Sequence, residues 1–147
     1  MNAVDVVKAW QRGQRIDGRA ANEAYLDDDI RLLLPGADPI VGREAASKHF
    51  EAVEDSFKPL LHSTVDGPYT VFVCQDDMVA HRFRWNGETR DGQLVDLFIF
   101  NLYRVRNGKI THFEEHFDTL TRAGYSYAYD AKPASRSFNP DTRILES

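Results

Sequence analysis

Residues 94–117 read LVDLFIFNLYRVRNGKITHFEEHF, two runs rich in strand-forming residues on either side of a turn. β-Branched and aromatic residues dominate both runs, and such residues are typical of β-strands. The Asn107-Gly108 dipeptide between the runs suits a two-residue hairpin turn, which requires positive φ at both central positions. The sequence therefore predicts an antiparallel hairpin with strands at 94–105 and 110–117.

Two further strands are expected directly upstream of this hairpin. Strand-forming residues recur at 71–73 and at 78–85. Two dipeptides, Asn86-Gly87 and Asp91-Gly92, suit the turn that leads into the hairpin, and the sequence does not decide between them.

The first third of the chain has the pattern of helices. Apolar residues at helical spacing predict a helix from Ala3, Asp17 suits the N-cap of a second helix, and a third helix opens at Gly42. The compact apolar run at 30–34 predicts a buried strand, because Pro35 and the following glycine end it. Helices followed by a series of antiparallel strands indicate the α+β class.

Length and composition are those of one ordinary globular domain. The 147 residues are 42% hydrophobic and 28% charged, and they contain no run of about 20 apolar residues that could span a membrane. The single cysteine excludes an internal disulfide and a multi-cysteine metal site. The net charge of −5 offers no basic surface for nucleic acid or anionic lipid.

These properties set expectations for domain organisation and location. The N-terminal residues lack the basic and apolar stretches of a signal peptide, so a cytoplasmic protein is expected. Residues 1–147 are expected to form a single domain. Within it, residues 119–147 form an aromatic tail that we expect to act as a flap or as a dimer arm.

The strand at 94–105 carries apolar residues on both of its faces. Alternation places Phe98, Phe100 and Leu102 on one face. The other face carries Leu97, Ile99, Asn101, Tyr103 and Val105. We expect the helices to cover one face and a second sheet or a second subunit to cover the other. Because the chain has few elements left for the second face, a homodimer is expected.

Glu115 is a carboxylate that lies between aromatic rings on the last predicted strand. Alternation places Phe113 and Phe117 on its face. An apolar site disfavours the charged form of a carboxyl group and raises its pKa, which makes the group a useful proton donor near neutral pH. The alternative is that this face is solvated and that Glu115 has no catalytic role.

Histidine and arginine residues offer weaker signals. His112 and His116 lie about 13 Å apart along a strand, which is too far for them to share one metal ion. Arg82 and Arg84 share a face of their strand. Facing inward, they would need an anionic partner such as Glu115, and facing outward they would be solubilising charges. No phosphate-binding loop, dinucleotide fingerprint or nucleophile elbow is present, so neither a cofactor nor a metal is expected.

Four segments follow one another in an order and spacing that match a known family. They are YLDDDIRL at 25–32, GREA at 42–45, VAHRFRW at 79–85 and NGKITHFEEHFD at 107–118. Together they resemble the SnoaL-like branch of the nuclear-transport-factor-two-like superfamily. The resemblance implies a cone of helices packed on a strongly curved mixed sheet, which encloses an apolar pocket, commonly in a dimer. Known members include polyketide cyclases, ketosteroid isomerase and limonene epoxide hydrolase, and non-catalytic binding proteins share the fold.

Three polar residues match positions that carry chemistry in this family. Glu115 falls where the polyketide cyclases and the epoxide hydrolase keep a catalytic aspartate. Asn101 falls where the cyclases have a histidine and ketosteroid isomerase has an aspartate that stabilises an oxyanion. Arg82 matches the arginine that orients the acid in the epoxide hydrolase.

Other positions depart from the family patterns. The base position of ketosteroid isomerase is Leu33 here, its phenol position is Trp10, and the second aspartate of the epoxide hydrolase is Arg84. The mechanisms of these two enzymes are therefore disfavoured. The histidine pair of scytalone dehydratase, another member, is matched only loosely by His62 and His81.

The sequence leads to one enzymatic hypothesis and one alternative. The hypothesis is a cofactor-independent isomerase, cyclase or lyase that acts on a small, largely apolar, aromatic or polyketide-like molecule. Glu115 would move the proton and Asn101 would donate a hydrogen bond to a developing oxyanion. Arg82 would hold Glu115 or an anionic substrate group, and His62 would be a second proton carrier. The expected substrate-binding residues are Trp10, Leu33, Phe50, Phe113, Phe117 and Tyr103. The alternative is a non-catalytic ligand-binding or accessory protein in which Glu115 is locked in an ion pair with Arg82.

Overall fold

Two helices and six strands make up the described part of the chain. The computed structural model describes residues 1–59 and 64–118. The predicted proton carrier His62 and the predicted tail at 119–147 lie outside the described residues. The elements are α1 (Ala3–Tyr25), β1 (Leu26–Leu33), β2 (Ile40–Val41), α2 (Arg43–Asp55), β3 (Val71–Gln75), β4 (Met78–Glu88), β5 (Leu94–Arg106) and β6 (Lys109–Phe117). The expected α+β class is confirmed.

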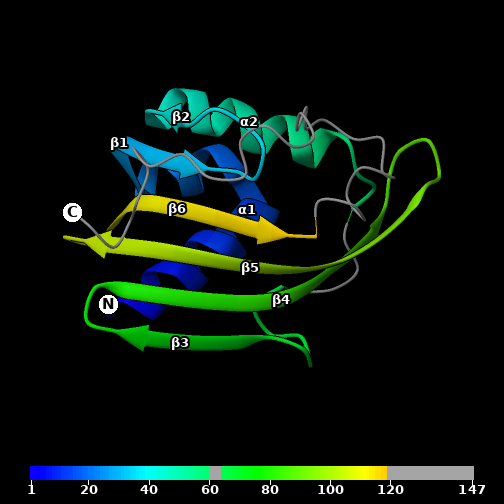
Figure 1. The fold of residues 1–147 in the computed structure, drawn as a ribbon. Coiled ribbons are helices and arrows are strands. Elements are labelled where there is room, and N and C mark those ends of the chain that lie inside the picture. Colours follow the sequence, from blue (N-terminus) through cyan, green and yellow to red (C-terminus); the bar gives the residue numbers. More distant parts are fainter. Residues whose placement is uncertain (60–63, 119–147) are drawn as a thin grey trace.

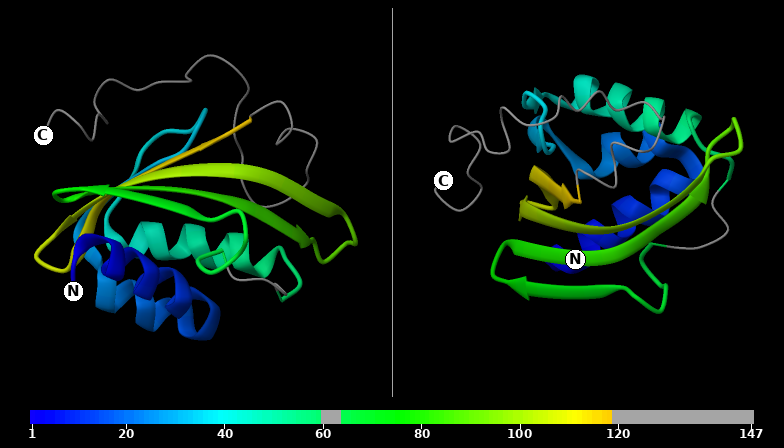
Figure 2. Two further views of the ribbon diagram at one scale, coloured as in Figure 1. Left: turned by 90° about the horizontal axis from the view of Figure 1, so that it is seen from below. Right: turned by 45° about the vertical axis from the view of Figure 1, so that its right-hand side comes forward.

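The strands form one mixed sheet in the order β2-β1-β6-β5-β4-β3 (Figure 1). β1 and β6 are parallel, and every other pair of neighbouring strands is antiparallel. The sheet curves, and both helices lie on its concave side (Figure 2). This arrangement is the expected packing of helices on a strongly curved mixed sheet.

Two turns fix the alignment of the long strands. Asn107 and Gly108 have φ values of 51° and 73°, which confirms the predicted hairpin turn between β5 and β6. Between β4 and β5, Gly92 has a φ of 90° and its amide donates to the carbonyl of Thr89. The competing dipeptide at 86–87 lies inside β4. Asp91-Gly92 is therefore the dipeptide that makes this turn.

Helix α1 is broken at Asp17 into two segments. This residue has φ −152° and ψ 94°, and its Oδ1 accepts a hydrogen bond from the amide of Ala20 at 3.0 Å. Asp17 thus caps the second segment, as the sequence predicted. The two segments lie side by side (Figure 2), and Gly13 permits this close approach. A Cβ at Gly13 would lie only 2.7 Å from the Cβ of Ala21.

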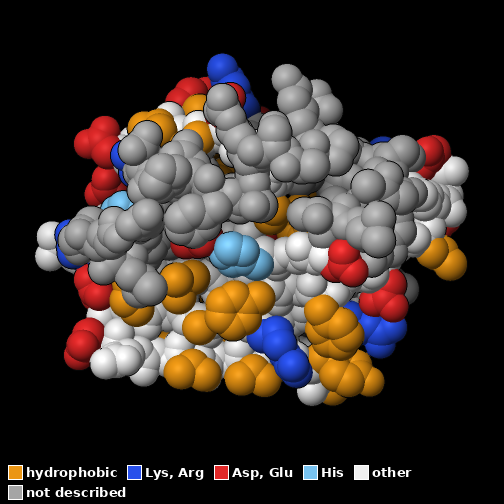
Figure 3. Space-filling view, in the orientation of Figure 1, with side chains coloured by type: hydrophobic (Ala, Val, Ile, Leu, Met, Phe, Trp, Pro, Cys, Tyr) orange, Lys and Arg blue, Asp and Glu red, His pale blue; other side chains and the backbone are white. Residues whose placement is uncertain are grey.

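The two faces of the sheet differ in burial. Along β5, Leu97 and Ile99 are buried on the concave face, whereas Phe98 and Phe100 on the convex face are 55% and 45% exposed. Figure 3 shows hydrophobic side chains gathered over β3, β4 and β5 on the convex face, with charged side chains among them. We call the exposed apolar side chains of this face the outer patch, which comprises Val71, Val73, Phe98 and Phe100. The predicted alternation is confirmed, and a second subunit over the outer patch stays a prediction.

Candidate active site

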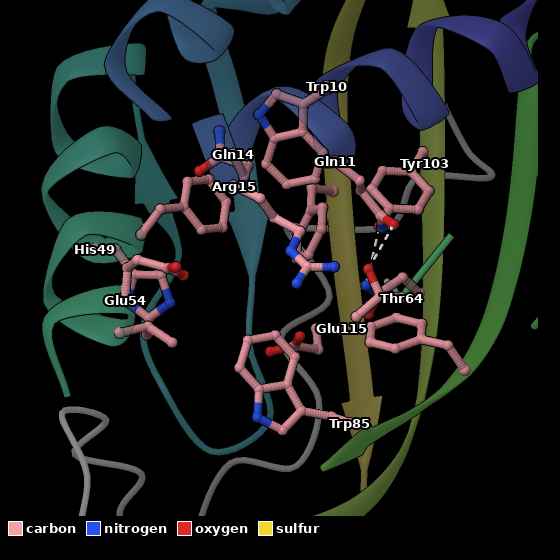
Figure 4. A pocket seen from close by; sticks show the side chains of 15 residues that line it. Trp10, Gln11, Gln14, Arg15, His49, Glu54, Thr64, Trp85, Tyr103 and Glu115 are labelled. Atoms are coloured by element: carbon pink, nitrogen blue, oxygen red, sulfur yellow. Dashed lines mark hydrogen bonds between the residues drawn. The ribbon is translucent and has the colours of Figure 1, made fainter. Parts of the chain in front are cut away.

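A cavity lies between the concave face of the sheet and the two helices (Figure 4). Its volume is about 130 Å³. Its apolar and aromatic walls are Trp10, Phe50, Val53, Phe83, Trp85, Tyr103 and Phe113. Its polar lining residues are Gln11, Gln14, Arg15, His49, Glu54, Thr64, Asn101 and Glu115. The cavity therefore combines walls of aromatic rings with polar side chains that can orient a ligand, as ligand sites commonly do.

Six of the ten residues expected from the sequence line this cavity. They are Trp10, Phe50, Asn101, Tyr103, Phe113 and Glu115. Leu33 does not line it, because β1 pairs Leu33 with Glu114, whose side chain points to the opposite face from that of Glu115. Phe117 packs instead against the buried cluster around Phe83 and Ile99. His62, as noted, is outside the described residues.

Arg82 lies on the convex face of β4, so the expected contact between Arg82 and Glu115 is wrong. Its side chain is exposed, and its Cζ atom is 5.7 Å from the centre of the Phe98 ring. The reason is the alternation along β4, which turns the buried residues His81 and Phe83 inward and Arg82 outward. The structural ion pair that defined the non-catalytic alternative is therefore not formed.

Three polar side chains form a row across the concave face. The register of β4 and β5 places His81 opposite Asn101, and the register of β5 and β6 places Asn101 opposite Glu115. Residues directly opposite in antiparallel strands point to the same face with Cβ atoms about 5 Å apart. We call His81, Asn101 and Glu115 the polar row. At one end of the polar row His81 lies beside Thr64, and the other two residues line the cavity.

His81 is a neutral, rigidly held imidazole. It is 0% exposed and stacked between the rings of Phe72 and Phe83, at centroid distances of 3.9 and 4.5 Å. Burial, with a smaller contribution from the charge of Lys8, lowers its pKa from 6.5 to about 4. Its Nε2 lies 3.2 Å from the carbonyl oxygen of Thr64. Because a carbonyl only accepts hydrogen bonds, Nε2 carries the proton and Nδ1 is an acceptor.

A hydrogen-bonded chain connects His81 with the phenol of Tyr103. The Nε2 of Gln11 lies 3.1 Å from Nδ1 of His81 and donates to the Tyr103 oxygen at 2.8 Å. The Nδ2 of Asn101 donates to the same phenol oxygen at 2.9 Å. Burial raises the pKa of Tyr103, and the charge of Glu115 acts in the same direction, so the phenol keeps its proton at neutral pH.

Asn101 also carries a polar atom that needs a partner. The residue is 2% exposed, and its Oδ1 has no hydrogen-bond partner in the part of the chain that the structure describes. A buried polar atom without a partner is costly, and such atoms in native proteins commonly await a ligand or a water. This carbonyl is a candidate contact for a bound molecule.

The helices add charged groups to the opposite side of the cavity. Figure 4 shows Arg15 pointing into the space between the helices and the sheet, with His49 and Glu54 on α2 beside it. Partial burial raises the pKa of Glu54, and the nearby charge of Arg15 opposes this shift. Burial lowers the pKa of His49. An acid, a base and a cation therefore lie within one cavity together with Glu115.

Trp10, which forms one wall, is held by the second segment of α1. Its Nε1 donates to Oδ1 of Asn22 at 2.9 Å, and Nε2 of Gln14 donates to the same oxygen at 2.6 Å. The indole meets Phe50 and Phe113 edge to face, at centroid distances of 5.2 and 5.8 Å. The broken helix thus fixes the position of the largest ring in the cavity.

Sequence reasoning missed the helical polar residues of the site. Positions 10, 11, 14 and 15 share one stripe of α1, and positions 49, 50, 53 and 54 share one stripe of α2. Once Trp10 and Phe50 were expected to face a pocket, helical spacing could have drawn in Gln11, Gln14 and Arg15 from α1. The same reasoning would have included His49 and Glu54.

Neither a metal cluster nor a membrane span emerges from the described residues. Among residues 1–59 and 64–118, no group of three His, Cys, Asp or Glu side chains is placed to hold a metal ion. In the same part of the chain, neither helix has the length and apolar character needed to cross a bilayer.

Comparison with known proteins adds the family. The model of the SnoaL-like domain family matches residues 3–113, about three quarters of the chain. The chain belongs to the SnoaL-like domain family. No curated protein matches this SnoaL-like domain significantly.

Several solved structures share the fold of this SnoaL-like domain. An NTF2-like protein from Burkholderia xenovorans LB400 is 20% identical, with a TM-score of 0.71 over 83% of this chain and 93% of that one. A candidate polyketide cyclase from Pseudomonas putida KT2440 is 16% identical, with a TM-score of 0.72 over 84% of this chain and 97% of that one. TerC, co-crystallised with polyporic acid, is 17% identical, with a TM-score of 0.66 over 83% and 95%. At these identities the likeness shows the fold alone.

Proposed function

We propose that this SnoaL-like domain is a cofactor-independent acid–base enzyme that moves a proton on a carbon next to a carbonyl group. The substrate is small, largely apolar, and aromatic or polyketide-like. Isomerisation, ring closure and elimination all begin with this proton transfer, so the proposal covers an isomerase, a cyclase or a lyase. Glu115 is the proton carrier.

The observation that supports this proposal is the position of Glu115 in the cavity. Its strand register places it opposite Asn101, and both residues line a cavity walled by the rings of Trp10, Phe83 and Phe113. A carboxyl group in such surroundings, next to hydrogen-bond donors for an oxygen, is the arrangement that proton transfer beside a carbonyl needs. The candidate polyketide cyclase among the structural neighbours and the polyporic acid in TerC support an aromatic or polyketide-like ligand.

The reaction follows from these groups. The carboxylate of Glu115 accepts a proton from the carbon next to the carbonyl, and the C–H electron pair forms a C=C bond while the carbonyl oxygen becomes an enolate. A hydrogen bond from the Tyr103 hydroxyl stabilises the charge on this oxygen, and the Nδ2 group of Asn101, which donates to the Tyr103 oxygen, supports that hydroxyl. The protonated Glu115 then returns the proton to a different carbon, which completes an isomerisation. In a cyclase, the enolate carbon instead attacks the carbon of a second carbonyl and closes a ring, the C=O π bond of that carbonyl breaks, and its oxygen takes the proton from Glu115.

Hydrogen exchange on a small ketone that carries an aromatic ring tests the proposal. Wild-type protein in D2O should accelerate loss of the proton signal at the carbon next to the carbonyl of 2-tetralone, measured by NMR. Glu115→Gln removes the proton acceptor while keeping the shape of the side chain, so the protein-dependent rate should fall by about two orders of magnitude.

The neighbouring glutamate provides a matched control. Glu114 lies on the convex face, where its Oε1 is 2.7 Å from Nε2 of His116, and it does not line the cavity. Glu114→Gln should leave the exchange rate unchanged. An exchange rate of Glu115→Gln within a few-fold of wild type would contradict the assignment of Glu115. Binding of 2-tetralone without any acceleration of exchange by the wild type would favour the non-catalytic ligand-binding alternative.

A further inference from the structure

The hydrogen-bond directions in the cavity wall specify the kind of oxygen that a ligand presents there. We propose that the cavity recognises a hydroxyl oxygen of the phenol or enol class, which accepts a hydrogen bond from Tyr103 and donates one to Oδ1 of Asn101. The proposal deepens the proposed function, because an enol is the form that results when Glu115 moves the proton. It rests on the same site, but binding alone tests it.

The first step of the argument fixes the amide of Gln11. His81 carries its proton on Nε2, because its partner there is the carbonyl of Thr64. Its Nδ1 is therefore an acceptor, so the group of Gln11 that lies 3.1 Å away must be the NH2 group and not the carbonyl. The second hydrogen of this NH2 group points to the Tyr103 oxygen at 2.8 Å.

The second step follows the proton of Tyr103. The phenol oxygen accepts one hydrogen bond from Gln11 and a second from Nδ2 of Asn101 at 2.9 Å. These two bonds use both of its lone pairs. The hydroxyl hydrogen has no acceptor among residues 1–59 and 64–118, and Tyr103 lines the cavity. This hydrogen is left for the ligand.

The third step uses the remaining polar atom of Asn101. Its Oδ1 is buried without a partner in the described residues, and it belongs to the same amide that touches the Tyr103 oxygen. The wall therefore presents one donor and one acceptor beside each other. A hydroxyl group satisfies both, whereas a ketone or an ether oxygen can only accept and leaves Oδ1 of Asn101 unpaired.

The rest of the cavity favours a flat ring behind this hydroxyl group. The edges of Trp10, Phe50 and Phe113 meet around the space, with Tyr103 and Phe113 centroids 4.9 Å apart. Aromatic rings pack well in such edge-to-face surroundings. A phenol, or an enol conjugated to a ring, is the ligand that matches both the shape and the hydrogen bonds.

A ligand series on the wild-type protein tests the proposal directly. The probes are 2-naphthol, which both donates and accepts, and two acceptor-only analogues, 2-methoxynaphthalene and 2-tetralone. Dissociation constants come from NMR titrations of labelled protein at neutral pH. We expect 2-naphthol to bind at least about tenfold more tightly than either analogue, because a buried acceptor left unpaired costs that much affinity. Equal or tighter binding of 2-tetralone would overturn the proposal.

Variants locate the effect and separate it from catalysis. Asn101→Leu should reduce the preference for 2-naphthol over 2-tetralone to about threefold or less, because it removes the acceptor that only 2-naphthol satisfies. Tyr103→Phe removes a donor that both probes use, so it should weaken the binding of both. Asn86→Leu, at a residue of β4 that does not line the cavity, should keep the full preference. Glu115→Gln should also keep the preference while it loses hydrogen exchange, so the two proposals can fail independently. If Asn101→Leu does not fold, the wild-type series and Tyr103→Phe still decide the matter, and a Tyr103→Phe protein that binds 2-naphthol and 2-tetralone as tightly as the wild type would overturn the proposal.

Discussion

The concave and convex faces of the sheet are built from the same strands, but the aromatic rings on the two faces differ in burial and in packing. On the concave face, Tyr103 and Phe113 are buried and pack edge to face. On the convex face, Phe98 and Phe100 are about half exposed, and Arg82 lies over one of them. The presence of aromatic rings on a face of the sheet therefore does not by itself show that this face binds a ligand.

The polar groups distinguish the two faces more clearly. Convex charges pair with one another, as in the two-pronged contact of Arg84 with Asp96 at 2.7 Å. On the concave face, Oδ1 of Asn101 has no partner in the part of the chain that the structure describes, and the proton of Tyr103 has no protein acceptor there. Buried polar atoms without a partner also occur elsewhere in the described residues, as at Nε of Arg31, so it is their place in the cavity wall that makes the groups of Asn101 and Tyr103 a candidate ligand site.

The largest expected difference between the faces is in the stability that a phenyl ring contributes. Phe113 is 3% exposed and contacts Trp10 and Tyr103, so Phe113→Ala should lower the free energy of unfolding by about 3–5 kcal/mol. Phe100 is 45% exposed, so Phe100→Ala should cost less than about 1 kcal/mol in dilute protein. Urea unfolding of both variants measures this contrast. A loss for Phe100→Ala as large as that for Phe113→Ala would mean that the convex face is buried too.

The second expected difference is the sign of the pH dependence contributed by one histidine on each face. Burial lowers the pKa of His81 to about 4, below its unfolded value of 6.5. As the pH falls from 6.5 towards 4, the unfolded chain therefore binds a proton at His81 before the folded chain does, and the protein loses stability. One pKa unit corresponds to about 1.4 kcal/mol, so this residue should account for a loss of about 3 kcal/mol.

Replacement of His81 isolates its contribution. Glutamine keeps an N–H for the carbonyl of Thr64 and an oxygen for Gln11, but it does not titrate. The loss of unfolding free energy between pH 6.5 and pH 4 should therefore be smaller in His81→Gln than in the wild type, by about 3 kcal/mol. An unchanged slope would mean that His81 is already charged, or solvated, in the folded protein.

On the convex face, His116 should act in the opposite direction. Its hydrogen bond to Glu114 raises its pKa above the usual histidine value. The stability that it contributes is present below the unfolded pKa of about 6.5 and is lost as the pH rises through the folded pKa. The effect is small because the pair is partly exposed to solvent. NMR titration of the two imidazoles should place the pKa of His116 above 6.5 and that of His81 below it, and the reverse order would contradict the two environments.

Local signals made most of the fold predictable. The Asn107-Gly108 turn, the cap at Asp17 and the alternation along β5 depend on a few neighbouring residues and on a period of two, so they can be read without knowing the fold. The same alternation grouped Asn101 with Tyr103 and Glu115 with Phe113, and the structure puts both groups on the concave face. Their convergence on one cavity then required only that the two strands pair at the observed register.

The parts of the site that could not be predicted depend on contacts between distant segments. Alternation along β4 allows two arrangements, one with His81 facing inward and one with Arg82 facing inward. The pairing of β4 with β5 decides between them. The composition of the segment favours the observed arrangement, because His81, Phe83 and Trp85 form a more apolar set than the two arginines. The role of Gln11 was not predictable, since its partners lie 70 and 92 positions away in the sequence.

The smallest expected effect concerns the convex face, which we expect to join two copies of the chain through the outer patch. If it does, a tenfold rise in protein concentration should raise the free energy of unfolding per dimer by about 1.4 kcal/mol. Phe98→Glu places a charge in the centre of the outer patch and should abolish this dependence and halve the mass measured by analytical ultracentrifugation. Ile16 on α1 is 88% exposed and distant from the outer patch, so Ile16→Glu should leave both properties unchanged. A wild-type protein that sediments as a monomer at every concentration would contradict the expected dimer and would mean that Phe98 and Phe100 stay exposed to solvent.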